Sequence, residues 1–109
     1  MLKVEVDAGV CGFHTCVRAA SEDGQNVSFD IASECEKIRS LAIALKAKGP
    51  VDAYQEISAE GQGVVMATVR ENLKGCCAGC AVPTGIFKAM QVSAGLALPK
   101  DIIIKMSCE

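Results

Sequence analysis

The sequence predicts one α+β domain spanning residues 1–109, with a mainly antiparallel four-stranded sheet and helices on one of its faces. Three observations lead to this prediction. Apolar and polar residues alternate along three runs within residues 2–31, which is the period of half-buried strands. Apolar residues then recur at helical spacing in three segments between residues 33 and 98. A continuous apolar run at 102–106 completes the order β-β-β-α-α-α-β as a covered strand.

The three N-terminal strands are predicted at residues 2–8, 13–20 and 25–31. The first has apolar residues at every second position and charged residues between them. Two glycines mark the loop that follows it, where the backbone has to turn tightly. The Asp23-Gly24 pair is typical of a hairpin turn and separates the second strand from the third. These runs therefore predict an antiparallel meander.

The first helix is predicted to begin at a capping box, with Ser33 as the N-cap and Glu36 at the N3 position. It ends at Gly49-Pro50, since glycine and proline terminate helices. Residues 51–57 are compatible with more than one element and are left unassigned. The apolar stripe of this first helix comprises Ile38, Leu41, Ala42 and Leu45.

Two more helices are expected beyond a flexible loop at residues 60–63. The second runs over 64–74, and Gly75 ends it directly before a group of cysteines. The third begins near Pro83, which suits a first helical turn, and breaks at residues 98–101. The run 102–106 then follows as a strand, which we expect beside the N-terminal strand because an edge position would expose three isoleucines.

Composition narrows the possible partners and compartments. The net charge is −2 and the chain has no basic tract, so nucleic acid and anionic membrane are not expected as partners. No apolar stretch approaches the ~20 residues that span a bilayer, and the N-terminus does not resemble a signal peptide. We therefore expect a cytoplasmic protein, where thiols stay reduced. No oligomeric state, protein partner or small-molecule ligand is predicted.

Seven cysteines in 109 residues are the main chemical feature of the chain. Their odd number fits poorly with a fully paired disulfide framework. Thiolates are soft metal ligands and nucleophiles, so a dense set of them favours metal or thiol chemistry.

Three positions are the strongest candidates for a site. Cys35 falls at the predicted start of a helix, where amide groups and the helix dipole stabilise a thiolate, although it also lies on the apolar stripe and could simply pack. Cys11 lies in a glycine-flanked loop, where sites are often found. Cys77 and Cys80 form a C-x-x-C, a spacing that lets two sulfurs converge on one ion. Adjacent Cys76 could replace Cys77.

The other candidates fit a structural role better. Cys16 points to the polar face of its strand, and Cys108 lies near a chain end. His14, the only histidine, shares a polar face with Cys16 and is more often a surface residue than a ligand there. We expect Cys11, Cys35 and Cys80 to meet at one end of the sheet.

Several segments together resemble a family of small uncharacterised cysteine-containing proteins found mostly in archaea and anaerobic bacteria. The resemblance rests on Cys11-Gly12-Phe13, Ser33-Glu34-Cys35, and two stretches that start at Cys80 and Ala94. It implies that Cys11, Cys35 and Cys80 are the shared cysteines, while Cys16, Cys76, Cys77 and Cys108 belong to this member. It implies no activity.

Three functions remain open at this point. The leading one is a soft-metal protein that binds zinc or an iron–sulfur cluster through Cys11, Cys35, Cys80 and one of Cys76 or Cys77. The second is a metal-free thiol redox protein or thiol enzyme with Cys35 as its nucleophile, so enzymatic activity is itself undecided. The third is a structural or partner-binding domain whose cysteines only pack.

Overall fold

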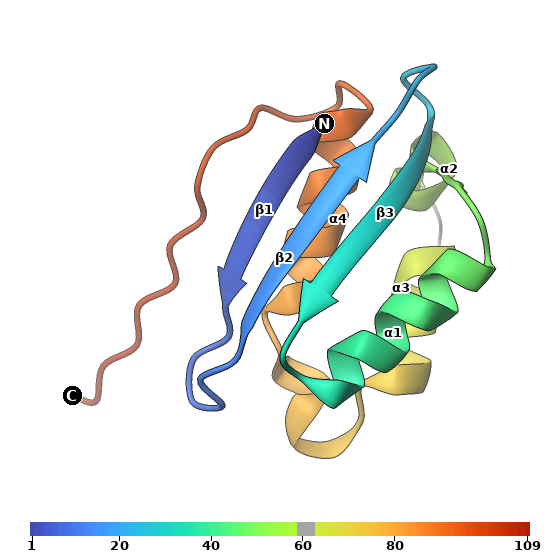
Figure 1. Cartoon of the computed structure of the whole chain (residues 1–109). Coiled ribbons are helices and arrows are strands. Elements are labelled where there is room, and N and C mark those ends of the chain that lie inside the picture. The colour runs from blue at the N-terminus through green and yellow to red at the C-terminus, as the bar shows by residue number, and fades with distance from the viewer. Residues whose placement is uncertain (59–62) are drawn as a thin grey trace.

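The structure is a computed structural model that describes residues 1–58 and 63–109. Its strands form one antiparallel sheet in the order β1-β2-β3-β4 (Figure 1). The meander consists of β1 (Leu2–Asp7), β2 (His14–Ala20) and β3 (Asn26–Ser33). A short β4 (Val51–Asp52) pairs with the other side of β3. The predicted α+β class with a four-stranded antiparallel sheet is confirmed.

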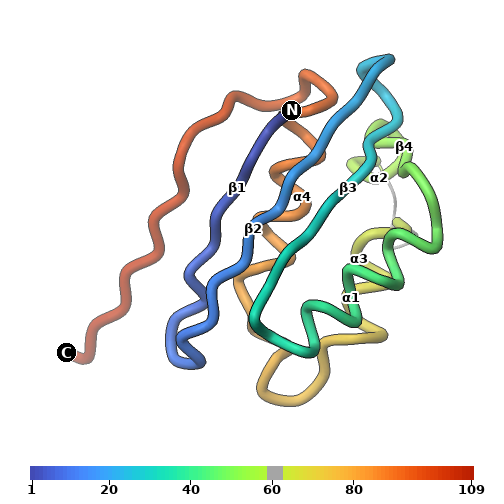
Figure 2. The backbone as a smooth tube through the Cα atoms, viewed as in Figure 1, coloured from blue at the N-terminus to red at the C-terminus, as the bar shows by residue number. Residues whose placement is uncertain are grey.

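Helices pack against this sheet. They are α1 (Glu36–Ala47), α2 (Ala53–Ser58), α3 (Val64–Asn72), the 3-10 helix η1 (Gly75–Gly79) and α4 (Val82–Ser93). The first of these runs alongside β3, and α4 contacts β1 and β2 (Figure 2). In turn, α3 packs against both α1 and α4. The core is therefore enclosed between one face of the sheet and these helices.

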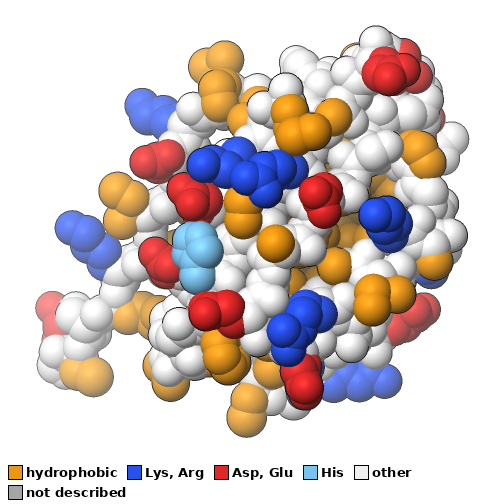
Figure 3. Space-filling view, in the orientation of Figure 1, with side chains coloured by type: hydrophobic (Ala, Val, Ile, Leu, Met, Phe, Trp, Pro, Cys, Tyr) orange, Lys and Arg blue, Asp and Glu red, His pale blue; other side chains and the backbone are white. Residues whose placement is uncertain are grey.

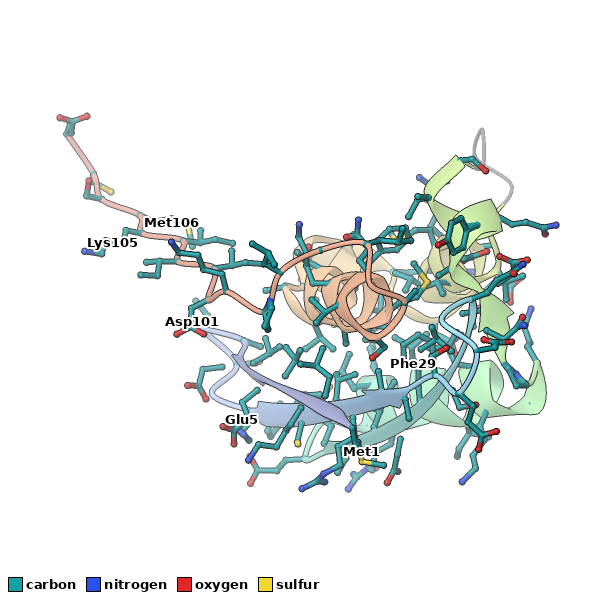
Figure 4. The ribbon with its side chains drawn as sticks, turned by 90° about the horizontal axis from the view of Figure 1, so that it is seen from above. Met1, Glu5, Phe29, Asp101, Lys105 and Met106 are labelled. Carbon is teal, nitrogen blue, oxygen red and sulfur yellow. The ribbon has the colours of Figure 1, made fainter. Side chains whose placement is uncertain are left out.

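The core is aliphatic, as the composition requires. The inward residues of the strands alternate with exposed ones, and each long helix contributes one buried stripe. Seen from above, Phe29 points into the space between the sheet and α4 (Figure 4). The largest fully buried apolar side chains are Val17, Val27, Ile38, Leu41, Leu45, Val65, Val82, Ile86 and Met90.

The opposite face of the sheet carries charged and polar side chains (Figure 3). Lys3, Glu5 and Asp7 project from β1 on this face, and His14 and Arg18 project from β2. All five are exposed, so the strands are half-buried as their alternation predicts.

The fourth strand was predicted in the wrong place. Residues 102–106 form no strand and are exposed, with Ile103 at 77% and Ile104 at 68%. The amide of Lys100 donates a hydrogen bond to the carbonyl of Leu98 (2.9 Å), and beyond this turn the chain leaves the body (Figure 4). The order β-β-β-α-α-α-β is therefore corrected, because the fourth strand comes from residues that the sequence left unassigned.

Residues 53–58 add a short helix, α2, which starts where the Asp52 carboxylate accepts hydrogen bonds from the amides of Tyr54 (3.0 Å) and Gln55 (3.2 Å). The predicted flexible loop at 60–63 lies, except for Gly63, outside the described residues.

Candidate functional site

Three connections meet at one end of the sheet, at the lower end of Figure 1. Both β1 and β3 run toward this end, so the β1–β2 loop and the start of α1 lie there. The connection from α3 to α4 passes the same end (Figure 2). These connections carry Cys11, Cys35, Cys77 and Cys80, and the predicted placement of Cys11, Cys35 and Cys80 is confirmed.

The loop with Cys11 is a tight turn that presents its thiol to solvent. Gly9 and Gly12 have positive φ angles of 88° and 72°, which residues with a Cβ rarely adopt. The amide of Gly12 donates to the carbonyl of Gly9 (2.9 Å), and that of Ala8 donates to Phe13 (3.3 Å). Cys11 is exposed between these contacts. The thiol can therefore reach a ligand without disturbing the core.

Cys35 is the N-cap residue of α1, and this corrects the predicted capping box. Ser33 is the last residue of β3, so it cannot cap the helix, and Glu36 occupies the first helical turn. The hydroxyl of Ser33 instead accepts the amide of Cys35 (3.1 Å) and shares a hydrogen bond with the hydroxyl of Thr15 (2.7 Å). Arg39 closes the first turn by donating its amide to the Cys35 carbonyl (2.9 Å).

Thr15 and Ser33 position Cys35, and the sequence did not lead us to predict this role. Thr15 is 1% exposed, although its strand face is otherwise apolar. A buried hydroxyl needs a hydrogen-bond partner, and here the partner lies directly opposite on β3. The signal in the sequence was Thr15 itself, a polar residue on a strand face that is otherwise apolar and predicted to point inward.

The remaining thiols lie on η1 and just after it. Gly75, with φ at 65°, starts this 3-10 helix, and the amide of Cys80 donates to the carbonyl of Cys77 (3.2 Å). Cys77 and Cys80 are half-buried and pack against the core, whereas Cys76 is exposed. The C-x-x-C spacing thus places its two thiols on the inner side of one turn. Of the two alternatives, Cys77 is better placed than Cys76.

Three of these thiols act electrostatically on the fourth, Cys80. Burial raises the pKa of the Cys80 thiol, while the backbone amide of Val82 acts in the opposite direction. Negative charge on Cys11, Cys35 or Cys77 raises this pKa further. Cys11, Cys35 and Cys77 therefore each lie within electrostatic range of Cys80, and we call these four residues the cysteine cluster.

The cysteine cluster is not arranged as a finished coordination sphere. Within residues 1–58 and 63–109, no three Cys, His, Asp or Glu side chains stand close enough to hold one ion as they are. The ligands come from a loop, a helix end and a short 3-10 turn, where side-chain rotation and small backbone shifts are least restricted. Ion binding therefore requires the four thiols to close around the ion.

The structure separates the other candidates from the cluster. Cys16 lies in the middle of β2, opposite Glu5, and Cys108 lies in the exposed tail. On the outer face, His14 Nδ1 is 2.8 Å from the Asp7 carboxylate and Nε2 is 3.6 Å from that of Glu5. The hydrogen bond with Asp7 raises the pKa of His14, and partial desolvation opposes this shift. His14 therefore belongs to a surface ion-pair group.

Comparison with known proteins identifies the family of this chain but gives no activity. The sequence model of a family described as a family of unknown function (DUF6951) matches residues 2–106. No curated protein and no solved structure gave a match. Among the described helices, none combines the length and the apolar character needed to cross a bilayer.

Proposed function

Because this chain belongs to DUF6951, a family of unknown function, its chemistry has to be inferred from its own residues, and we propose that it binds a soft metal. The ligands are Cys11, Cys35, Cys77 and Cys80, with Cys76 as the alternative to Cys77. Four thiolates suit tetrahedral zinc or an iron–sulfur cluster and do not suit hard, oxygen-preferring ions. The compartment that goes with this role is a reducing cytoplasm.

One observation carries the proposal. Thiols from three connections, far apart in sequence, come close enough at one end of the sheet to influence the pKa of Cys80. Chance packing of small apolar residues would not require four of the seven cysteines to gather there, while the other three are exposed or face away. The C-x-x-C turn supplies two ligands from one short segment. The other two ligands then connect this turn to the β1–β2 loop and to the start of α1.

Metal binding has a physical consequence for this fold. Each thiol must lose its proton to coordinate, so affinity rises with pH until the thiols are ionised. The burial that raises the pKa of Cys80 makes its proton harder to remove than that of an ordinary thiol. A bound cation compensates directly, because it replaces the proton with a stronger positive charge. The cluster would then hold the β1–β2 loop, α1 and the α3–α4 connection together.

The test is anaerobic purification followed by elemental analysis and absorption spectroscopy. A cluster gives a brown protein with visible absorption, and zinc gives a colourless protein with about one equivalent of metal. Metal-free protein under reducing, anaerobic conditions, with no uptake of added zinc or iron and sulfide, would refute the proposal.

Variants identify the ligands. Cys35→Ala and Cys80→Ala should each abolish metal binding as completely as the double change, because losing one ligand disables the site. Cys16→Ala and Cys108→Ala are matched controls that remove a thiol outside the cysteine cluster, and they should retain the metal. Cys76→Ala and Cys77→Ala should give partial effects where one replaces the other. Loss of metal in the Cys16 variant alone would place the site elsewhere.

Thiol chemistry without a metal is the second candidate, and the same proximity supports it. The Cys35 thiolate, at the amino end of α1, would attack a substrate disulfide, form a mixed disulfide and release the first substrate thiolate. Cys80 or Cys11 would then attack the sulfur of Cys35, form an intramolecular disulfide and release the second substrate thiolate. This requires rapid alkylation of Cys35 near pH 7 in metal-free protein. Slow alkylation of all four clustered thiols, together with no metal, would leave a packing role.

A further inference from the structure

The outer edge of β1 is an open strand edge. β1 pairs with β2 on one side, and no described strand pairs with its other side. Its backbone therefore presents unpaired amides and carbonyls along Leu2–Asp7. On the inner face, Leu2, Val4 and Val6 are only half-buried, although α4 packs against them. An added strand would cover both the backbone edge and these side chains.

The C-terminal tail, residues 98–109, is an extended segment without a partner among the described residues. Its large apolar side chains are exposed: Leu98 85%, Ile102 52%, Ile103 77%, Ile104 68% and Met106 92%. The tail starts near the N-terminus of β1 and runs in the same direction as β1, clear of the body (Figure 2). Lys105 and Met106 lie away from the sheet (Figure 4). A β-branched apolar run of this kind is a strand former.

Charges on the tail and on β1 match in one orientation. With Ile103 placed beside Glu5, a parallel tail sets Asp101 beside Lys3 and Lys105 beside Asp7, which gives two opposite-charge pairs on the outer face. An antiparallel tail over the same residues would set Lys105 beside Lys3 and Asp101 beside Asp7, where like charges repel. The charges therefore select the parallel orientation.

The apolar residues match in the same register. Ile102 then lies beside Val4 and Ile104 beside Val6, and all four side chains point to the inner face that α4 covers. Met106 continues this face beside Ala8. The alternation of the tail thus agrees with the alternation of β1 at each position from 101 to 106 except Ile103, which lies beside Glu5 on the outer face.

We propose that the tail of a second copy of this chain occupies this edge, so that two copies exchange tails and each β1 gains a parallel fifth strand. The chain's own tail leaves the body after the turn at Leu98–Lys100 and leaves its own edge open. In a two-fold dimer each copy gives one tail and receives one, so both open edges and both apolar tails are covered.

The exchange has a consequence for the cysteines. β1 ends at Asp7 and turns back at Gly9, so beyond Met106 the tail of one copy runs on to this turn of the other copy, and Cys108 comes near the loop that carries Cys11. The tail end thereby reaches the loop of the cysteine cluster. This inference does not depend on metal binding, because the pairing is carried by backbone, apolar and charged groups of β1 and the tail.

Light scattering on the full-length chain, over a range of concentrations, tests the exchange. We expect twice the mass of the chain. Ile104→Lys should weaken the dimer about a hundredfold or more, since each dimer buries this side chain twice. Ile103→Lys is the matched control, because it places a lysine beside Glu5 on the outer face and should keep the dimer. Both positions are exposed in the single chain, so circular dichroism should show both variants folded.

A disulfide crosslink tests the register. After treatment with a chelator, mild oxidation with diamide should link Cys108 of one copy to Cys11 of the other, giving a dimer on a non-reducing gel whose peptides identify the pair. Cys108→Ser should abolish this product, and Cys16→Ser should not. A monomeric native chain, equal behaviour of the Ile103 and Ile104 variants, or a Cys11–Cys108 disulfide within one chain would overturn the proposal.

Discussion

Gly85 is where α4 comes closest to β1, and replacing it by alanine tests the packing of the two layers. A Cβ at this position would lie 2.7 Å from Cγ2 of Val6 and 3.4 Å from Cγ1 of Val4. Carbon atoms in contact prefer separations of about 3.5–4.0 Å, so the first contact is roughly 1 Å too short. Gly85→Ala therefore forces either α4 or the edge strand to move.

The expected size follows from two opposing effects. Overpacking of this kind costs about 1–3 kcal/mol. Alanine is better than glycine inside a helix by about 0.8–1.0 kcal/mol, which offsets part of that cost. The free energy of unfolding should fall by about 1 kcal/mol, which is roughly 4 °C in Tm for a chain of this length.

A double-mutant cycle in urea denaturation separates the two effects. In a Val6→Ala background the close contact is gone, so Gly85→Ala should stabilise the protein by its helix propensity alone. The coupling energy between the two positions should be about 1–3 kcal/mol. Thr84→Ala, at an exposed neighbour on the same helix, is the control without a new contact. Zero coupling, with Gly85→Ala stabilising in both backgrounds, would refute the close approach of α4 to β1.

Three further predictions concern buried, titratable and metal-dependent contacts. The nearly buried Glu56 carboxylate accepts the amides of Val64 (2.8 Å) and Val65 (2.6 Å) at the start of α3, so Glu56→Ala should cost about 1–3 kcal/mol in urea denaturation. Glu56→Gln keeps one acceptor and should cost less; equal losses would contradict this role. The pKa of His14 is raised by Asp7, so its contribution to stability is complete below about pH 6.5 and lost as pH rises through the higher folded-state pKa. In an NMR titration of this only histidine, Asp7→Asn should lower the pKa, and an unchanged value would exclude the Asp7 contact. Removing a bound metal with a chelator should lower Tm, because a metal that binds only the folded state stabilises that state. An unchanged Tm would mean that the metal does not connect the β1–β2 loop, the start of α1 and the α3–α4 connection.

The meander was predictable because its signals are local. Alternation determines which face of each strand is buried, and Thr15, Val17 and Ala19 are buried as expected. The Asp23-Gly24 turn also forms: the Asp23 carboxylate accepts the amides of Gln25 and Asn26 (both 2.8 Å), and Gly24 has φ at 73°. Such features involve residues only a few positions apart, so the order of amino acids is sufficient to identify them.

The fourth strand could not be predicted, because it depends on which edge is free and what reaches it. The run 102–106 has the composition of a covered strand, yet no strand within residues 1–58 or 63–109 pairs with it. Val51–Asp52 has little strand character, but it follows α1 and arrives beside β3, where two residues pair. Pairing across a sheet is a non-local contact, so strand propensity alone does not decide it.

The candidate site was also predictable only in part. The number of thiols, the C-x-x-C spacing and the absence of any other metal-ligand pattern are properties of the amino-acid order, and they directed attention to soft-metal chemistry. That Cys11, Cys35, Cys77 and Cys80 share one end of the sheet, while Cys16 does not, follows from the direction in which each strand runs. The 3-10 geometry of η1 turns the side chain of Cys77 to the core and that of Cys76 to solvent. Residue chemistry and periodicity are local and can be read along the chain, whereas the neighbours of a thiol, a strand edge or a helical glycine arise only when distant segments pack together.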